Sequence, residues 1–372
     1  MKIQIVGTRG IPAEHGGFET FTEHFAVYLQ KKGWQVTVYC QEEGSGEIFE
    51  DEWCGIYRVH IPVPLRGAKG TIVFDWKSTC YAINKKNPVL ILGYNTALFS
   101  IYYRLKGIKN IINMDGVEWR RAKWSFWQRT WLYMNEKLGA WLGNQLIADH
   151  PSIKVRLSRF TSSAKITMIP YGTDIVQTAS KEPLDLFGLQ ENSYALVIAR
   201  PEQENSILEI VKAYSSVKRG CPLVILGKYT PDSNRYHQAV LEAAGEEVRF
   251  VGAIYDKATV QSLRFFARFY IHGHTVGGTN PSLVESLGTG TPIIAHNNKY
   301  NRWVAGSNAL YFSTIEDCAK HIEMLLQDDG CVIEMKKHSL QRAEETFRLE
   351  AVHHAYEQLL LQVTEGKEKG RK

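Results

Sequence analysis

The sequence contains no long apolar run. None of its stretches, over 372 residues, approaches the roughly eighteen uninterrupted apolar residues that a membrane-spanning helix needs. The opening segment MKIQIVGTRG turns polar too soon for a secretion signal. The six cysteines are scattered and form no C-x-x-C pair, which argues against a disulfide framework or a zinc ribbon. These absences predict a protein of the reducing cytoplasm.

Two signatures of nucleotide chemistry are also missing. There is no D-x-D motif at the end of a predicted strand, which argues against a metal that bridges a nucleotide-sugar diphosphate. The glycine loop near the start is not a clean G-x-G-x-x-G, and Tyr39-Cys40-Gln41 stands where a nicotinamide-binding domain would carry an acid. His272 ends a predicted strand, His274 follows two positions later, and no third candidate ligand lies nearby in the sequence. We therefore predict no metal and no bound cofactor.

What the sequence does contain is an uneven distribution of charge. The net charge is +5, of which residues 1–175 carry +7 and residues 176–372 carry −2. Within residues 53–173, 18 Lys and Arg face 5 Asp and Glu, a difference of +13. Such a surplus favours an anionic partner: a membrane surface, a nucleic acid or a phosphorylated substrate. A basic but merely solvated surface explains the charge equally well.

Apolar runs alternate with amphipathic segments along the whole chain, a pattern typical of α/β proteins with parallel sheets. Two such series predict two Rossmann-like, doubly wound domains. We expect an N-terminal domain over 1–172 and a C-terminal domain over 173–345. Residues 346–372 are expected to form a helix that crosses back to the N-terminal domain, followed by a frayed tail.

Two loops combine glycines with a following helix. The first, Gly7 to Glu19, contains Gly16 and Gly17 and leads from a strand into a helix, whose free N–H groups can hold an anion. The second is HGHTVGGTNPSLVE, in which an N-cap signal and a proline open a helix that carries Glu285 one turn in. A carboxylate there can accept hydrogen bonds from a sugar, or simply be favoured by the helix dipole. Its candidate donor-binding residues are His274, Gly278, Thr279, Asn280, Ser282 and Glu285.

Charged residues come directly after predicted strands at three further places. Arg200 and Lys228 come after two strands of the second series, where doubly wound sheets bind ligands, and could clamp a diphosphate. Asp115 and Glu118 come after a strand in the basic region and could bind acceptor hydroxyls, or cap a helix.

Residues 119–141 hold five of the nine tryptophans, interleaved with basic side chains. A stripe recurs every three or four residues, on one face of a helix: Trp124, Trp127, Trp131, Met134, Leu138 and Trp141. The stripe could face the core, but tryptophan beside lysine and arginine is also typical of an interfacial membrane helix. No recognised nucleic-acid module surrounds it, and we predict no nucleic-acid partner.

Several runs in this sequence resemble those of retaining glycosyltransferases of family four, and more narrowly a bacterial rhamnosyltransferase-like branch that builds capsule and cell-wall polysaccharide. They are VGTRGIPAEHGGFETF, NMDGVEWRRAKW, KITMIPYGTDI, ARPEQENSI and HGHTVGGTNPSLVESLGTGTPIIA. The resemblance covers nearly the whole chain and implies the GT-B fold, with two domains facing across a cleft. It also implies a donor on the C-terminal domain and an acceptor on the N-terminal one.

Carried over by position, the resemblance makes Glu285 the second glutamate of an E-x7-E motif that binds the nucleotide ribose. Arg200 matches the residue that neutralises the donor diphosphate, and Gly16 and Gly17 match a loop near the phosphates. Two departures stand out: Gly277 occupies the place of the first glutamate, and Lys228 has to substitute for a lysine that usually comes soon after the arginine. Asp115 lies about where many relatives have an active-site histidine.

The residues and the resemblance together predict a metal-independent, retaining glycosyltransferase that moves a hexosyl or 6-deoxyhexosyl unit onto a lipid-linked glycan. The sugar expected first is L-rhamnose, from a dTDP donor. Arg200 and Lys228 would stabilise the leaving diphosphate, and Asp115 would orient the acceptor together with Glu118 and Glu19. We expect the protein to bind anionic lipid at the inner face of the plasma membrane, through Arg120, Arg121, Lys123 and Trp124. The alternatives are an NAD-dependent nucleotide-sugar epimerase or dehydrogenase and a non-catalytic adaptor at the membrane.

Overall fold

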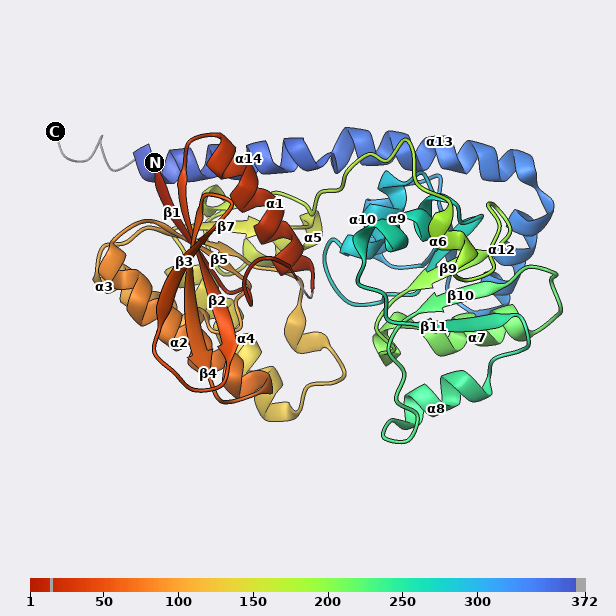
Figure 1. Cartoon of the computed structure of the whole chain (residues 1–372), viewed down its shortest axis with the longest axis horizontal. Coiled ribbons are helices and arrows are strands. Elements are labelled where there is room, and N and C mark those ends of the chain that lie inside the picture. The colour runs from red at the N-terminus through yellow and green to blue at the C-terminus, as the bar shows by residue number, and fades with distance from the viewer. Residues whose placement is uncertain (14–15, 366–372) are drawn as a thin grey trace. The chain divides into compact units, whose positions relative to one another are not determined.

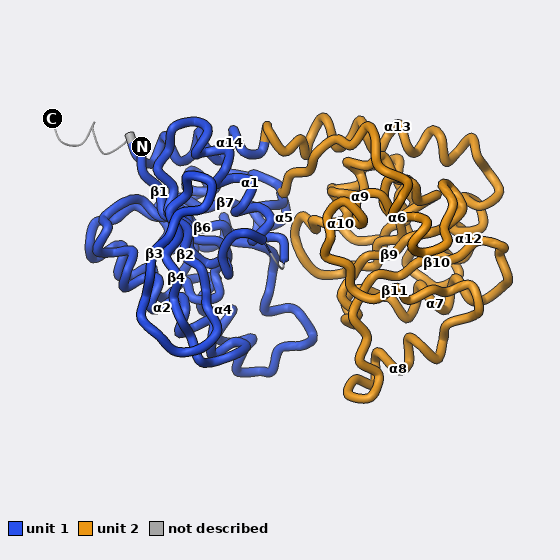
Figure 2. Tube along the Cα trace, in the orientation of Figure 1, with its two compact units in different colours: residues 1–170, 352–372 blue, residues 171–351 orange. Residues whose placement is uncertain are grey.

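The computed structural model describes residues 1–13 and 16–365. These fall into two compact units (Figure 2): unit 1 comprises Met1–Pro170 together with the chain from Val352 onward, and unit 2 comprises Tyr171–Ala351. The first crossing between the units thus comes after Pro170, close to the predicted boundary after Gly172. The second precedes Val352, a few residues after the predicted start of the C-terminal helix.

Unit 1 is built on an eight-stranded sheet of order β3-β4-β2-β1-β5-β6-β7-β8. All neighbouring strands are parallel except β3, which pairs antiparallel with β4. The strands are β1 (Lys2–Val6), β2 (Gln35–Glu43), β3 (Phe49–Trp53), β4 (Ile56–Val63), β5 (Val89–Leu92), β6 (Asn110–Asn113), β7 (Gln145–Ala148) and β8 (Ile166–Met168). Most are short Val- and Ile-rich runs that are buried, as parallel strands covered on both faces require.

The helices of unit 1 connect these strands (Figure 1). They are α1 (Gly17–Lys31), α2 (Gly67–Lys85), α3 (Ser100–Leu105), α4 (Phe126–Leu142) and α5 (Pro151–Leu157), with short 3₁₀ turns η1 (Ala97–Phe99), η2 (Glu118–Arg120) and η3 (Ser163–Lys165). Strand β3, which the sequence did not predict, has the exposed sequence FEDEW. Its charged edge position explains why no apolar run marks it.

Unit 2 contains a six-stranded, all-parallel sheet of order β11-β10-β9-β12-β13-β14. Its strands are β9 (Ala195–Ile198), β10 (Leu223–Leu226), β11 (Val248–Gly252), β12 (Phe269–His272), β13 (Ile293–His296) and β14 (Leu310–Phe312). Its helices are α6 (Glu182–Asp185), α7 (Ile207–Ser215), α8 (Arg235–Glu242), α9 (Lys257–Phe265), α10 (Pro281–Gly288), α11 (Lys299–Ala305), α12 (Ile315–Gln327) and α13 (Asp329–Thr346), with the 3₁₀ turn η4 (Gln203–Asn205). Two parallel sheets flanked by helices confirm the α/β fold class predicted from the sequence.

The two chain crossings leave unit 2 beside each other. Thr173 N–H donates to the carbonyl of Phe347 at 2.7 Å, and Leu349 N–H donates to the carbonyl of Thr173 at 2.9 Å. From there α14 (Leu349–Glu365) enters unit 1, where Tyr356 accepts a hydrogen bond from Asn113 Nδ2 at 2.7 Å. The C-terminal helix is therefore fixed to the end of β6.

α14 also places a buried histidine against α1. His353 lies among the rings of Phe21, Phe25 and Tyr28, and its Nε2 has no hydrogen-bond partner within the described chain. Burial lowers the pKa of His353 to about 4, and the nearby His24 shifts it the same way. The folded protein thus keeps this imidazole neutral.

We expect unit 1 to lose stability as the pH falls below 6.5. Below pH 6.5, His353 becomes protonated in the unfolded chain, whereas in the folded chain it stays neutral until the pH reaches about 4. Between pH 6.5 and pH 5 this single group lowers the free energy of unfolding by about 1.6 kcal/mol. Urea unfolding at pH 6.5 and pH 5 measures this loss of stability. His353→Phe should weaken the pH dependence of the unfolding free energy, whereas the exposed neighbour variant His354→Gln should leave it unchanged. The same pH dependence in the wild type and both variants would contradict the role given to His353.

Among the described residues, no helix is both long enough and apolar enough to cross a membrane. All six cysteines are free thiols.

Candidate active site

Arg200 and Lys228 lie at the carboxyl edge of the sheet in unit 2. Their strands β9 and β10 are neighbours, and Ile198 pairs with Leu226, so that each basic residue stands two positions beyond the same rung. The two strand ends approach closely, because a Cβ on Gly227 would come within 2.7 Å of the Ala199 carbonyl. Both basic side chains are exposed, and neither has an ion-pair partner among the described residues. Two uncompensated cations at one sheet edge could together bind an anion.

Asn205 ties this edge to the next loop. Its Nδ2 donates to the carbonyl of Arg200 at 2.7 Å, and its Oδ1 contacts Nδ1 of His274. The loop after β12 packs tightly here, since a Cβ on Gly273 would stand 2.0 Å from the Asn205 carbonyl. Only glycine fits at that position. The arrangement fixes the backbone that carries Arg200 relative to the glycine loop.

The start of α10 lies beside the ends of β9 and β12. Asn280 caps the helix by accepting from Ser282 N–H at 3.0 Å, and Pro281 takes the first helical position. The Ser282 hydroxyl lies 2.9 Å from Tyr270 Oη and 3.3 Å from the carbonyl of Ile198. The predicted cap is confirmed, and the partial positive charge of this helix start belongs to the same sheet edge as Arg200.

Glu285 is held by two side chains that the sequence did not point to. Its Oε2 lies 2.6 Å from Nη2 of Arg264, and its Oε1 accepts from Tyr171 Oη at 3.4 Å. The Arg264 side chain is 9% exposed and the Glu285 side chain 31%. Glu285 thus neutralises a buried guanidinium and still presents part of its carboxylate to solvent. A group so fixed can accept hydrogen bonds from a ligand without first being ordered.

His272 and His274 have different environments. His272 is buried, with Nδ1 3.2 Å from Tyr270 Oη, and burial holds its pKa well below the usual range. His274 Nδ1 contacts Asn205, as above. Over residues 1–13 and 16–365, no three His, Cys, Asp or Glu side chains gather closely enough to hold a metal ion.

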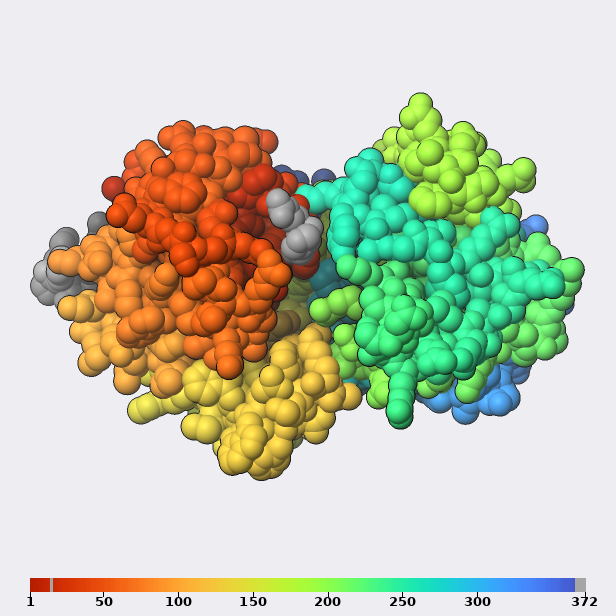
Figure 3. Space-filling view, turned by 60° about the horizontal axis from the view of Figure 1, so that its bottom comes forward, coloured from red at the N-terminus to blue at the C-terminus, as the bar shows by residue number. Residues whose placement is uncertain are grey.

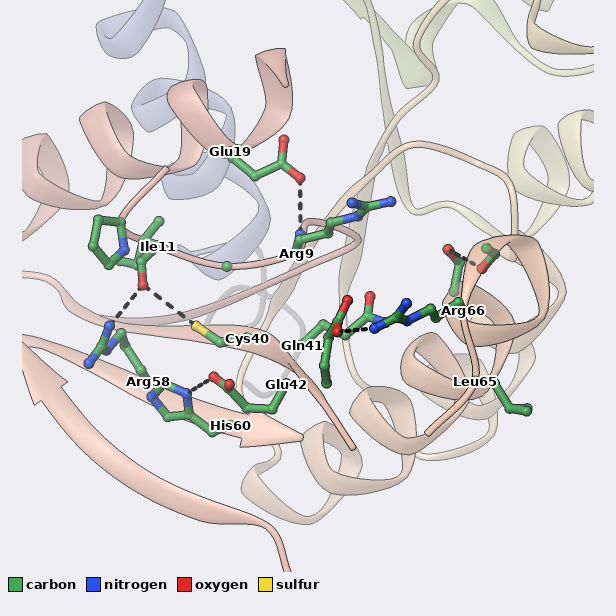
Figure 4. A pocket seen from close by; sticks show the side chains of 15 residues that line it. Arg9, Ile11, Glu19, Cys40, Gln41, Glu42, Arg58, His60, Leu65 and Arg66 are labelled. Carbon is green, nitrogen blue, oxygen red and sulfur yellow. Dashed lines mark hydrogen bonds and ion pairs between the residues drawn. The ribbon is translucent and has the colours of Figure 1, made fainter. Parts of the chain in front are cut away.

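The glycine loop of unit 1 opens beside a cavity. Gly16 adopts a φ of 82° as the N-cap of α1, and Glu19 Oε1 accepts from Arg9 N–H at 3.3 Å. The cavity, of about 410 Å³, is lined by polar side chains from the segment after β1, the start of α1, the end of β2 and the middle of β4 (Figure 4). These include Arg9, Glu19, Gln41, Glu42, Arg58 and His60. Its size and polarity suit a hydroxyl-rich ligand.

Asp115 and Glu118 come after β6 on the same edge, two strands away from β1 in the sheet order. Asp115 adopts a left-handed φ of 48°, and its N–H donates to Asn113 Oδ1 at 2.9 Å. Such a conformation is uncommon for a non-glycine residue and is enriched at functional positions. Glu118 is buried and ion-paired with Arg121 at 2.8 Å. Burial raises the pKa of the Glu118 carboxyl, and Arg121 opposes that shift.

The residues predicted to touch the membrane surround Glu118. Arg121 and Lys123 both face its carboxylate, at 2.8 and 3.9 Å. Arg120 is exposed and lies over the Trp119 ring, whereas Trp124 is half-buried beneath Lys123. Two of these four side chains are therefore engaged in ion pairs within the unit.

The structure brings most of the predicted donor-binding residues together. Arg200, Lys228, the loop from His274 to Ser282, and Glu285 all lie at or just beyond the carboxyl edge of one sheet in unit 2. Gly16, Gly17, Glu19, Asp115 and Glu118 share the corresponding edge in unit 1. Sequence reasoning missed Asn205 and Arg264. A polar residue a few positions after Arg200 gave a weak signal for the first, and nothing in the sequence indicated the second.

Solved structures of glycosyltransferases share this architecture. Sucrose-phosphate synthase from Thermosynechococcus elongatus matches with a TM-score of 0.81 at 16% identity, over 98% of this chain and 99% of that one. HepE from Anabaena, in complex with UDP, matches with a TM-score of 0.74 at 13% identity, over 97% and 99%. The chain has the GT-B fold. A glycosyltransferase from Rickettsia africae matches at 0.71 and 14% identity, over 98% of each chain.

At these identities the likeness concerns the fold alone. Residues 1–174 match a family described as a domain of unknown function (DUF1972). No curated protein matches the sequence significantly. Membership of family four and of the rhamnosyltransferase-like branch stays a prediction.

Proposed function

We propose that this protein is a nucleotide-sugar-dependent glycosyltransferase that holds its donor at the carboxyl edge of the sheet in unit 2. The observation that carries the proposal is the convergence of Arg200, Lys228 and the start of α10 on that edge. Two cations and a helix N-terminus suit a diphosphate. The GT-B fold supports this placement, since HepE was solved with UDP and also with UDP and glucose.

Each candidate residue has a distinct role in the proposed reaction. Arg200 and Lys228 stabilise the negative charge that develops on the leaving diphosphate, together with N–H groups between Gly278 and Ser282. Glu285 accepts hydrogen bonds from the nucleotide ribose. No enzymatic base is required for retention if a phosphate oxygen of the donor removes the acceptor proton.

The acceptor role falls to unit 1. Asp115 orients the acceptor, and Glu19 lies in the polar cavity beside the glycine loop. Gly16 and Gly17 let the backbone approach the transferred sugar. Glu118 contributes less directly, because its carboxylate is already paired with Arg121.

The finer assignment is to L-rhamnose from dTDP-rhamnose and to a lipid-linked glycan of a surface polysaccharide. It is supported by the resemblance of the two glycine loops and by Gly277, which stands where relatives carry a carboxylate beside the donor sugar. A thermal-shift panel of nucleotide sugars tests it, with NAD included. A true donor at a hundredfold excess over its Kd stabilises the fold by about 2.7 kcal/mol. Stabilisation by NAD alone would favour the epimerase or dehydrogenase, and no stabilisation by any nucleotide sugar would contradict the proposal.

Metal independence is a separate prediction of this proposal. Because the sequence has no D-x-D motif and Arg200 and Lys228 offer fixed positive charge at the donor edge, we expect transfer to continue undiminished in excess EDTA. Release of nucleoside diphosphate, measured with and without chelator, checks this. Complete loss that magnesium or manganese restores would show that a metal neutralises the diphosphate.

A further inference from the structure

The helix α4 is folded with its apolar stripe facing outward. Its buried residues are Leu132, Asn135, Glu136, Gly139, Ala140 and Leu142. The stripe lies on the opposite side: Trp127 is 78% exposed, Met134 54% and Trp141 71%, with Trp131 and Leu138 half-buried between them. For Trp127, Met134 and Trp141 the core-facing interpretation of the stripe is wrong.

A buried polar network explains this inversion. Glu136 accepts hydrogen bonds from Trp119 Nε1 at 3.0 Å and from Arg156 Nη2 at 2.7 Å, and Asn135 Oδ1 accepts from Leu98 N–H at 2.9 Å. These partners hold the polar face of α4 inside unit 1. The tryptophans are left on the surface as a consequence.

The exposed stripe continues onto a neighbouring helix. η1 and α3 present Leu98, Ile101 and Leu105, which is 75% exposed, and the Leu98–Asn135 hydrogen bond joins them to α4. At the C-terminal end of α4, Lys165 Nζ donates to the Trp141 carbonyl at 3.5 Å. Burial lowers the pKa of Lys165, and the nearby positive charge of Arg104 lowers it further, so α3 lies close to this end of α4. We call this surface the α3/α4 face: Leu98, Ile101, Leu105, Trp127, Trp131, Met134, Leu138 and Trp141.

The charge around the α3/α4 face has one sign. All five acids of residues 53–173, namely Asp75, Asp115, Glu118, Glu136 and Asp149, are buried or half-buried. Among the 18 basic residues of the same range, Arg104, Lys106, Arg129, Lys137 and Arg159 are exposed on or near α3, α4 and α5. An apolar surface ringed by cations complements an anionic one. Figure 3 shows the gold-coloured part of unit 1, where η2 and the start of α4 lie, projecting from the surface.

We propose that the α3/α4 face docks unit 1 onto the surface of an anionic lipid bilayer. Tryptophans favour the interfacial zone, and aliphatic side chains such as Leu105 and Met134 enter the acyl boundary beneath the headgroups. A second copy of the chain fits less well, because it would bring two basic surfaces together. Aliphatic residues between the rings also make a poor stacking platform for nucleic acid.

The sequence had indicated both the tryptophan stripe and the four residues Arg120, Arg121, Lys123 and Trp124 as membrane contacts. Because Arg121 and Lys123 are paired with Glu118, the surface proposed here keeps the stripe and relies on α3 and α4 for the rest. The proposal does not depend on the proposed transferase activity, since it concerns binding in the absence of any nucleotide sugar.

Vesicle co-sedimentation of the full chain tests the proposal. We compare phosphatidylcholine vesicles with vesicles that also contain phosphatidylglycerol, without donor or acceptor. The apolar variant combines Trp127→Ser, Trp141→Ser and Leu105→Ser, and its matched control combines Leu186→Ser, Val217→Ser and Ile333→Ser, all exposed residues of unit 2. The charge variant combines Arg104→Glu with Lys106→Glu, against Lys218→Glu with Lys320→Glu. Circular dichroism verifies that each variant is folded.

The wild type and both controls should bind the anionic vesicles, and the two α3/α4 variants should bind at least roughly tenfold more weakly. Raising the salt concentration should weaken wild-type binding, because exposed charges are screened over about 10 Å at 0.1 M. Equal binding by variants and controls would overturn the proposal, as would no vesicle binding by the wild type. If the wild type bound no vesicles but formed a dimer or bound an oligonucleotide, and the apolar variant alone lost that complex, the face would belong to another partner.

Discussion

Replacing Arg200 with alanine should reduce the rate of sugar transfer by roughly 30-fold to 1,000-fold, equivalent to about 2–4 kcal/mol of transition-state stabilisation. The guanidinium stands at the carboxyl end of β9, without an ion-pair partner among the described residues, so its charge is available to the diphosphate. Because the side chain is exposed, the melting temperature should hardly change. Measuring kcat/KM with the donor identified by the thermal-shift panel checks both expectations.

Lys218→Ala provides the matched control for Arg200→Ala. Lys218 is an exposed cation of the same unit, but it precedes β10 and therefore lies toward the opposite edge of the sheet. Its removal changes the net charge equally, and we expect transfer to stay within about twofold of the wild type. Transfer by Arg200→Ala within threefold of the wild type would remove the arginine from the proposed site.

Replacing Glu285 with glutamine should weaken donor binding by roughly 10-fold to 150-fold, because a hydrogen bond to a charged group contributes about 1.5–3 kcal/mol. The structure adds a second consequence that the sequence did not indicate. Loss of the carboxylate charge leaves the buried guanidinium of Arg264 without its ion-pair partner, which should lower the free energy of unfolding by about 1–3 kcal/mol. Donor titration calorimetry and thermal unfolding measure the two effects.

Glu285→Asp separates these two roles. Aspartate keeps the negative charge that Arg264 needs but withdraws the carboxylate by one methylene from the solvent-facing side. We expect this variant to recover much of the lost stability while donor binding stays weak. Wild-type donor affinity in Glu285→Gln, alongside the stability loss, would limit Glu285 to pairing with Arg264.

The ends of the strands were the most predictable part of the site. Apolar runs of four or five residues defined β9 and β10, and the parallel arrangement placed the residues after both strands at one edge of the sheet. Arg200 and Lys228 could therefore be assigned to neighbouring positions without coordinates, and the register of Ile198 with Leu226 agrees. The cap at Asn280 was equally readable, because Asn-Pro before an apolar helix has a local physical cause.

The orientation of α4 could not be predicted in the same way. Helical periodicity defines a face, but it does not say whether that face points to the core or to solvent. The answer depends on Glu136, whose partners Trp119 and Arg156 lie 17 and 20 residues away along the chain. The pairing of Arg264 with Glu285 could not be predicted for the same reason, because Arg264 belongs to α9 and not to the loop that precedes α10. Long-range pairs of polar side chains leave no periodic trace in a sequence.

The most direct test of the central claim is transfer itself. Purified protein is incubated with dTDP-rhamnose labelled in the sugar and with a lipid-linked glycan extract, and the label in the lipid fraction is counted. We expect labelled lipid and an equivalent release of dTDP with the wild type, and a loss of both with Arg200→Ala but not with Lys218→Ala. If neither dTDP-rhamnose nor any other nucleotide sugar in the panel releases its nucleotide in the presence of acceptor, the claim that this edge of unit 2 supports glycosyl transfer is contradicted.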